Sequence, residues 1–198
     1  MLSEEKKFEV AYDHYKDTFT KIEYHCKLRD RLFLYILLVL SLVCLGLFSY
    51  SEAEDILSQF ISSKLGISSV LDVSFVGSLI WFGLLSLVIR YFQTVTTIER
   101  YYPYLHKLEK WVDHRCGEDV ITREGKSYLE NYPWFSVWVH FLYTILFPIL
   151  LLIISALKIS NELAYQWPIT KVTSFNFFIF ICLVISTLLY LRLMHYKK

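Results

Sequence analysis

The sequence has 198 residues, of which 55% are hydrophobic and 18% aromatic, while only 20% are charged. A formal net charge of +1 does not favour a polyanionic partner, so direct nucleic-acid binding is not expected. The apolar residues are gathered in four long runs with the charged residues between them, which is the pattern of membrane-spanning helices of about 20 residues rather than of a soluble domain.

The four apolar runs cover residues 32–50, 73–92, 134–157 and 172–191. Each is long enough to cross about 30 Å of hydrocarbon, where every backbone polar group must be paired inside its own segment. The sequence therefore predicts an all-α, four-helix integral membrane protein. Pro148, in the middle of the third run, predicts a kink in that helix.

The distribution of Lys and Arg predicts how the chain is oriented. Seventeen of the twenty lie in residues 1–31, in residues 90–126 and in the tail, 192–198. The connections 51–72 and 158–171 together hold the other three. Because Lys and Arg are retained on the cytoplasmic side, both termini and the long middle segment are expected there.

Residues 1–31 are predicted to form a cytoplasmic helical arm. Ser3 is suited to cap its first turn, and Glu4 and Glu5 suit the positive end of the helix dipole. Apolar and aromatic residues recur every three or four positions and form a cytoplasmic seam, at Phe8, Tyr12, Tyr15, Phe19 and Ile22. Two arrangements are open for this seam. It packs on the chain's own middle segment or on the bilayer surface, or it pairs with the same arm of a neighbouring subunit.

The remaining segments connect the spans. Residues 51–72 form an outside loop in which a short interfacial helix is predicted, and residues 158–171 form a second outside loop. The cytoplasmic segment 93–133 is expected to extend the second span as a helix and to break at Pro103. Because it is too short to build a core alone, it is predicted to form a small helical cytoplasmic cap together with the arm.

Polar residues inside a span are functional candidates because they are costly in hydrocarbon. His140 is the deepest ionisable residue, two turns into the third run, and Ser136 and Thr144 recur on its face at a spacing of four. These residues either line a polar pathway or make hydrogen bonds to a neighbouring helix. No Asp or Glu lies within the four runs, which disfavours proton- or cation-coupled transport.

The second run is unusually rich in small residues. They lie at Ser74, Gly77, Ser78 and Gly83. Small side chains let helix backbones approach closely in a membrane, so this helix is expected to pack tightly, within one subunit or between subunits.

The sequence predicts no enzyme and no cofactor. It has no Gly-rich phosphate loop, no nucleophile elbow and no His-Glu-x-x-His, and its four cysteines match no metal-ligand spacing. One pattern departs from this picture. Arg100 followed by His106 resembles the catalytic pair of HEPN-type ribonucleases, so a membrane-tethered ribonuclease is kept as an alternative.

Three stretches carry a further resemblance: residues 29–33 (RDRLF), 98–109 (IERYYPYLHKLE) and 123–129 (REGKSYL). They are similar to small four-span proteins of bacterial antiviral defence, namely the membrane component of the Kiwa system and the membrane accessory of type VI-B CRISPR loci. The resemblance implies a bacterial inner-membrane protein that works with a cytosolic, nucleic-acid-acting protein.

The leading hypothesis is therefore a homo-oligomeric membrane component of antiviral defence. Such a component would sense membrane disturbance or alter permeability, together with a cytosolic partner. A stand-alone pore or channel subunit, with a pathway lined by the polar residues of the third run, is the alternative.

Overall fold

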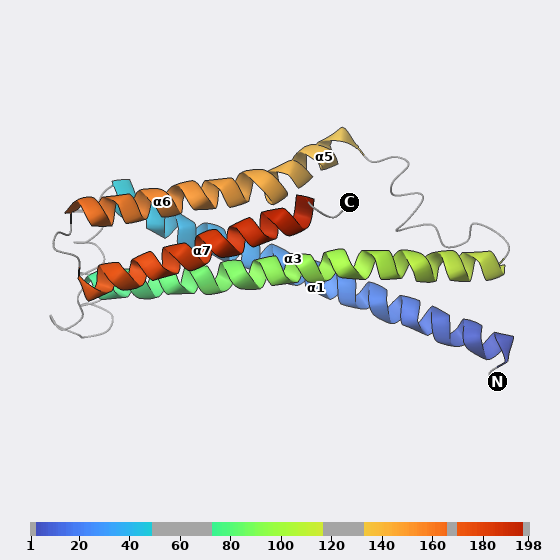
Figure 1. The fold of residues 1–198 in the computed structure, drawn as a ribbon. Helices are drawn as coiled ribbons and strands as arrows, with labels where there is room; N and C mark the ends of the chain where they lie inside the picture. Colours follow the sequence, from blue (N-terminus) through green and yellow to red (C-terminus); the bar gives the residue numbers. More distant parts are fainter. Residues whose placement is uncertain (1–2, 49–72, 117–132, 166–169, 196–198) are drawn as a thin grey trace. The chain divides into compact units, whose positions relative to one another are not determined.

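The structure, a computed structural model, describes residues 3–48, 73–116, 133–165 and 170–195 (Figure 1). Every element within these residues is a helix, so the all-α fold is confirmed for the described part of the chain. In chain order the elements are α1 (Glu4–Phe48), α3 (Val73–Cys116), α5 (Trp134–Phe141), the π-helical segment η1 (Leu142–Leu146), α6 (Phe147–Tyr165) and α7 (Lys171–His195).

Four helical stretches are long and apolar enough to cross a membrane, which confirms the predicted number of candidate spans among the described residues. They are Glu4–Leu47, Phe75–Cys116, Trp134–Ala164 and Lys171–Met194. Large apolar side chains along them are exposed, for example Leu38 at 64% and Leu189 at 60%. Water would disfavour so many exposed apolar side chains, whereas hydrocarbon accommodates them. The chain is a multi-pass membrane protein.

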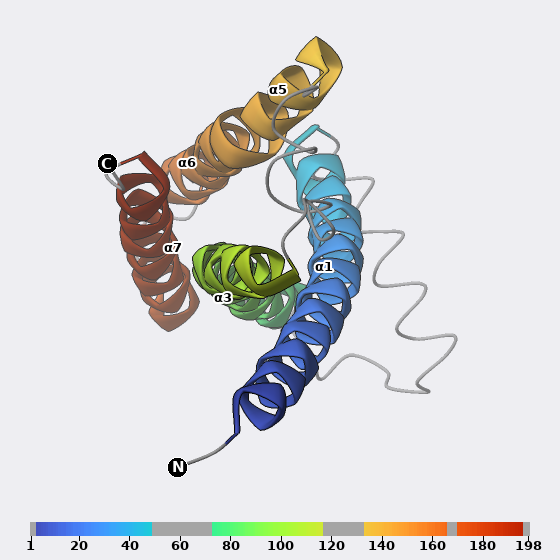
Figure 2. The same cartoon turned by 90° about the vertical axis from the view of Figure 1, so that its right-hand side faces the viewer.

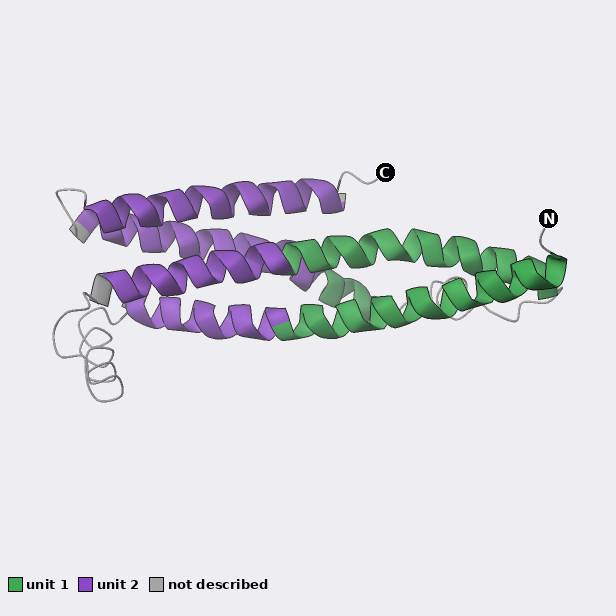
Figure 3. Cartoon of the chain, turned by 90° about the horizontal axis from the view of Figure 1, so that it is seen from below, with its two compact units in different colours: residues 1–31, 91–140 green, residues 32–90, 141–198 purple. Residues whose placement is uncertain are grey.

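The described residues divide into two compact units, coloured in Figure 3. Unit 1 comprises residues 1–31 and 91–140, and unit 2 comprises residues 32–90 and 141–198. The helices α1 and α3 each contribute to both units without an interruption in the helix.

In unit 1, the first part of α1 and the last part of α3 run antiparallel, side by side (Figure 3). Glu4 forms an ion pair with Arg115 at one end of the pair, and the ring of His25 lies 5.9 Å from the ring of Tyr101 farther along. Ser3 caps α1 as predicted, since its hydroxyl accepts a hydrogen bond from the Lys6 amide at 3.3 Å. The amino-terminal arm is therefore a helix that is paired with α3 of the same chain.

The predicted break at Pro103 is wrong, because α3 continues through it to Cys116. A proline removes one backbone hydrogen bond and crowds the preceding turn, at a cost of about 3 kcal/mol. Beyond it, however, Leu105 and Val112 are fully buried, in line with the buried Ile98 at a spacing of seven. Burying each such side chain contributes about 1.5–3 kcal/mol, so packing of this stripe outweighs the local cost.

In unit 2, α3 is surrounded by α1, α6 and α7 (Figure 2). Ile36, Leu84, Leu151 and Leu183, one from each helix, are fully buried and form the centre of its core. Phe33 of α1 adds edge contacts to aromatic rings of the third spanning stretch.

An irregular turn interrupts the third spanning stretch at the place where a kink was predicted. The Phe147 amide donates to the carbonyl of Leu142, five residues back, so η1 is wider than an α-helix. Pro148 follows directly, and its ring would collide with the carbonyl four residues earlier in a regular helix. The wider turn accommodates that ring.

One further predicted boundary is wrong, and two predicted segments lie outside the described residues. The helix α6 runs through Tyr165, so residues 158–165 are helical and not part of the predicted loop. The predicted interfacial helix in 51–72 and residues 117–132 of the middle segment lie outside the described residues.

Candidate functional site

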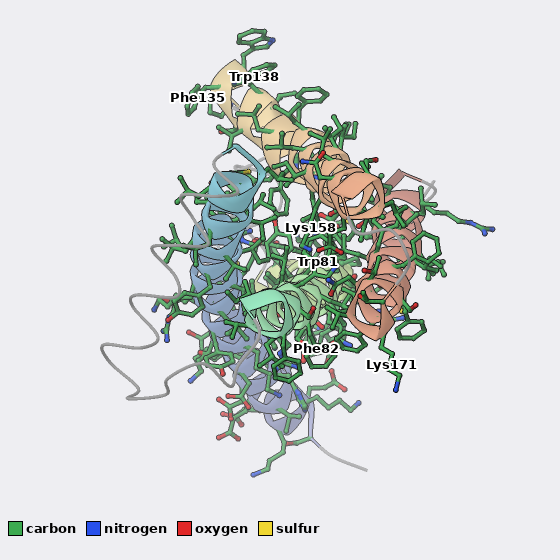
Figure 4. The ribbon with its side chains drawn as sticks, turned by 90° about the vertical axis from the view of Figure 1, so that its left-hand side faces the viewer. Trp81, Phe82, Phe135, Trp138, Lys158 and Lys171 are labelled. Atoms are coloured by element: carbon green, nitrogen blue, oxygen red, sulfur yellow. The ribbon has the colours of Figure 1, made fainter. Side chains whose placement is uncertain are left out.

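The most unusual group of side chains is a polar network inside unit 2, formed by Lys158, Glu162, Asn176 and Trp81. Asn176 and Trp81 are 2% and 0% exposed, and the side chains of Lys158 and Glu162 are only 15% and 17% exposed. The residues come from three helices: α6 supplies the charged pair, α7 the amide and α3 the indole. Figure 4 shows Lys158 and Trp81 next to each other between these helices.

Each member of the network contacts another. The ammonium of Lys158 pairs with the Glu162 carboxylate one turn later on α6. The Asn176 amide nitrogen lies 3.1 and 3.0 Å from the two oxygens of that carboxylate and donates to it. The Trp81 indole N–H donates to the backbone carbonyl of Asn176 at 3.3 Å. The Lys158 ammonium also lies 5.2 Å from the centre of the Trp81 ring, within reach of a cation–π interaction.

The helical period explains why these residues meet. Residues four apart lie on one face of a helix, so Lys158 and Glu162 share the face of α6 that also buries Ser155 and Ile159. Asn176 belongs to the buried stripe of α7, between Thr173 and Ile179. A buried amide needs partners, and the carboxylate on α6 accepts its hydrogen bond.

The network contains one positive charge, one negative charge and a neutral amide. The ammonium and the carboxylate compensate each other, which is the condition under which charged groups are tolerated away from water. The Asn176 side-chain oxygen is buried and accepts no hydrogen bond from the residues that the structure describes. Chemically the network joins α3, α6 and α7 through polar contacts. Within the part of the chain that is described, no cluster of three His, Cys, Asp or Glu residues suits a metal ion.

No family model, curated protein or solved structure matches the chain.

The residues predicted to line a polar pathway do not share one environment. Ser136 is half-buried and His140 exposed, both on α5, whereas Thr144 is buried in η1. Thr144 lies in the irregular turn itself, and Ser136 and His140 precede that turn. A common lining for the three residues stays a prediction.

The small residues of α3 differ in their surroundings. Ser74 lies in the first turn of α3, and Ser78 is buried at 2% exposure. A Cβ atom added at Gly77 or Gly83 would meet nothing within 4 Å. The expected close packing at these two glycines is therefore not made within the described residues, and packing between subunits stays a prediction.

The predicted seam of α1 is partly covered within the chain. Ile22 is buried, and Phe8, Tyr15 and Phe19 are half-buried. Tyr12 is 41% exposed, with its ring stacked on that of Phe8. Packing of the arm on the chain's own middle segment, the first of the two expected arrangements, is the one present in unit 1.

Electrostatic contacts at the start of α1 hold the arm to α3. Hydrogen bonds from Lys7 and Arg115 lower the pKa of the Glu4 carboxyl, and the positive charges of both residues act in the same direction. The carboxylate therefore stays ionised at neutral pH and keeps its ion pair with α3.

The pair that resembles a ribonuclease motif lies on one continuous helix. Arg100 is exposed, and His106 is half-buried with its ring 6.0 Å from that of Tyr102. Six residues at 100° each place the two side chains about 120° apart around α3. The helix does not bring them to a common face.

The polar network was missed from sequence because Lys158 and Glu162 were placed in a loop and Asn176 was passed over. Two signals point to it. The buried stripe of α6 continues from Ser155 to Ile159, two residues past the end of the apolar run, and Asn176 is an amide inside a stretch without charges.

Proposed function

We propose that the chain is a homo-oligomeric component of a bacterial inner membrane that works with a cytosolic protein in antiviral defence. Both termini lie in the cytoplasm, and the small helical cap is formed by unit 1. The chain senses membrane disturbance or alters permeability, and it acts through binding rather than through catalysis or a cofactor. The resemblance that residues 98–109 bear to membrane proteins of bacterial defence systems motivates this proposal.

One observation carries the proposal: α1 and α3 each pass without a break from a stretch without charges into a strongly charged one. The stretches without charges are residues 32–48 and 73–89, and the charged ones are residues 4–31 and 90–116. A protein bound to the charged stretches is attached to two spans through continuous helices. A membrane sensor that reports to a soluble partner needs this kind of connection.

The partner's docking surface is provided by exposed aromatic side chains of unit 1. Tyr24 of α1 is 63% exposed and Tyr104 of α3 is 45% exposed. Tyrosine is enriched at protein interfaces because it combines a large apolar surface with a hydroxyl that can hydrogen-bond. Substitution of these two tyrosines tests the proposal most directly.

The experiment is co-purification of the tagged chain from native membranes in mild detergent, followed by mass measurement of the intact complex. We expect a homo-oligomer that carries a soluble protein. The double variant Tyr24→Ser and Tyr104→Ser should lose that protein and keep the oligomer. His14→Ser, at another exposed position of α1, is the matched control and should retain both.

Two results would count against the proposal. The first is a soluble protein that stays bound to the tyrosine variant as tightly as to the parent. The second is a bare homo-oligomer, and conductance of that oligomer in liposomes would then favour the pore alternative.

A further inference from the structure

The third spanning stretch is too long for the bilayer. Trp134–Ala164 holds 31 residues, which at 1.5 Å each form a helix about 46 Å long. The hydrocarbon core is about 30 Å thick, so about ten residues at one end or the other lie outside it. Hydropathy alone favours the amino-terminal part, residues 134–157, as the crossing.

The polar network indicates which end of the third stretch lies outside the core. It connects α6 to α3 and α7, and the stretches without charges in these two helices limit where each can cross. The stretch of α3 without charges runs from Val73 to Ile89 and measures about 26 Å, so all of it is needed to cross the core. Trp81 stands at its middle, and its indole bonds to Asn176, inside the stretch of α7 without charges. Glu162 bonds to Asn176 and therefore lies at the same level.

The opposite assignment, in which residues 134–157 cross the core and Glu162 lies outside it, has an unfavourable consequence. If Glu162 lay outside the core, Asn176 and Trp81 would lie near its edge, and α3 would have to cross with later residues. These would include Arg90, Glu99 and Arg100. Charged side chains inside a span are strongly unfavourable. The opposite assignment would bring these three residues into the core, whereas the other assignment brings in Lys158 and Glu162, whose charges compensate each other. The carboxyl-terminal part of the stretch is therefore inside the membrane.

The surplus at the other end is α5, and its side chains suit the headgroup layer. Trp134, Phe135 and Trp138 are 83%, 71% and 47% exposed, and no residue of α5 is buried. The side chains of Phe135 and Trp138 project outward from the helix (Figure 4). Residues 134–140 group with the charged segments of unit 1, and the π-helical turn follows them. Trp is the residue most typical of the membrane–water interface.

We infer that α5 is an interfacial segment whose Trp134, Phe135 and Trp138 bind the headgroup layer of the bilayer. The third crossing then consists of η1 and α6, from Leu142 to Tyr165. This assignment places the Lys158–Glu162 pair inside the membrane and His140 at its surface. It does not depend on the proposed role in defence.

Cysteine accessibility tests the assignment. In a chain whose four cysteines are replaced by serine, single cysteines are introduced at Val137 or His140 of α5 and at Ser160 or Asn161 of α6, all exposed side chains. Membranes opened to both faces are treated with a charged, membrane-impermeant maleimide. Leu150→Cys, inside the core in either register, is the control and should stay unlabelled.

We expect labelling at Val137→Cys and His140→Cys, and no labelling at Ser160→Cys and Asn161→Cys. The reverse pattern, with the α5 positions protected and the α6 positions labelled, overturns the inference. Labelling at all four positions also overturns it, because the network would then be open to water. Two positions in each helix keep the test decisive if one variant fails to insert.

Discussion

The Lys158–Glu162 pair should be strongly coupled, and a double-mutant cycle measures that coupling. Removing one partner of a fully buried pair costs about 3–5 kcal/mol, whereas an exposed pair is worth about 0–1 kcal/mol. Because these side chains are only 15% and 17% exposed, we expect Glu162→Leu to lower the free energy of unfolding by about 2–4 kcal/mol. The change leaves the Lys158 ammonium uncompensated and deprives Asn176 of its acceptor.

Lys158→Met should also be destabilising, since it removes the ammonium that compensates the Glu162 carboxylate and leaves Asn176 as the partner of that carboxylate. The double variant should be destabilised by about 1–3 kcal/mol, less than the sum of the two single changes, because no charge is left behind and only the buried Asn176 amide loses its acceptor. The measurement is reversible unfolding in mixed detergent micelles, followed by tryptophan fluorescence. The exposed pair Glu23 and Lys27 of α1 is the matched control and should give additive effects. A coupling energy below about 0.5 kcal/mol between Lys158 and Glu162 would refute the reasoning.

Three further outcomes are expected in unit 1. Acidification should loosen the first turns of α1 in hydrogen exchange, because Lys7 and α3 hold the pKa of Glu4 below its ordinary 4.5; this stabilisation is present above pH 4.5 and is lost as the pH falls through the lowered pKa. Leu105→Ala should destabilise the helix pair by about 2–5 kcal/mol, measured by limited proteolysis, whereas Tyr104→Ala, at an exposed position, should change it by less than about 0.5 kcal/mol. Pro103→Ala should stabilise α3 by about 1–3 kcal/mol in the same assay, since it restores a backbone hydrogen bond at an exposed site. An unchanged stability would contradict this reasoning and mean that the proline relieves strain.

The number of candidate spans was predictable because a bilayer imposes a single, severe requirement. A run of about 20 apolar residues has few alternatives to a spanning helix, and α7, Lys171–His195, contains the predicted run 172–191. The helical arm was also readable, since Ser3 and the acidic first turn are local signals. The predictions that rested on the bilayer's requirement and on the capping signals of the first turn are confirmed for the described residues.

Predictions that depended on contacts with a neighbouring helix of the same chain were wrong. Pro103 is a strong local signal for a helix end, yet Leu105 and Val112 gain more from packing than the proline costs. Nothing in residues 99–107 alone shows that α1 lies alongside. The same holds for α6, where Lys158 and Glu162 look like loop residues until Asn176 is seen beside them.

The network also changes the argument about transport. The absence of a carboxylate from the apolar runs disfavoured a coupled transporter, but Glu162 lies on a helix that is part of a candidate span. Its surroundings nevertheless suit a fixed contact better than a carrier site. The Lys158 ammonium balances its charge and Asn176 donates to both of its oxygens, so exchange of a proton or cation at Glu162 would break these contacts and leave an ammonium without its counter-charge. A carboxylate held in this way joins α6 to α7 and, through the Trp81 indole, to α3.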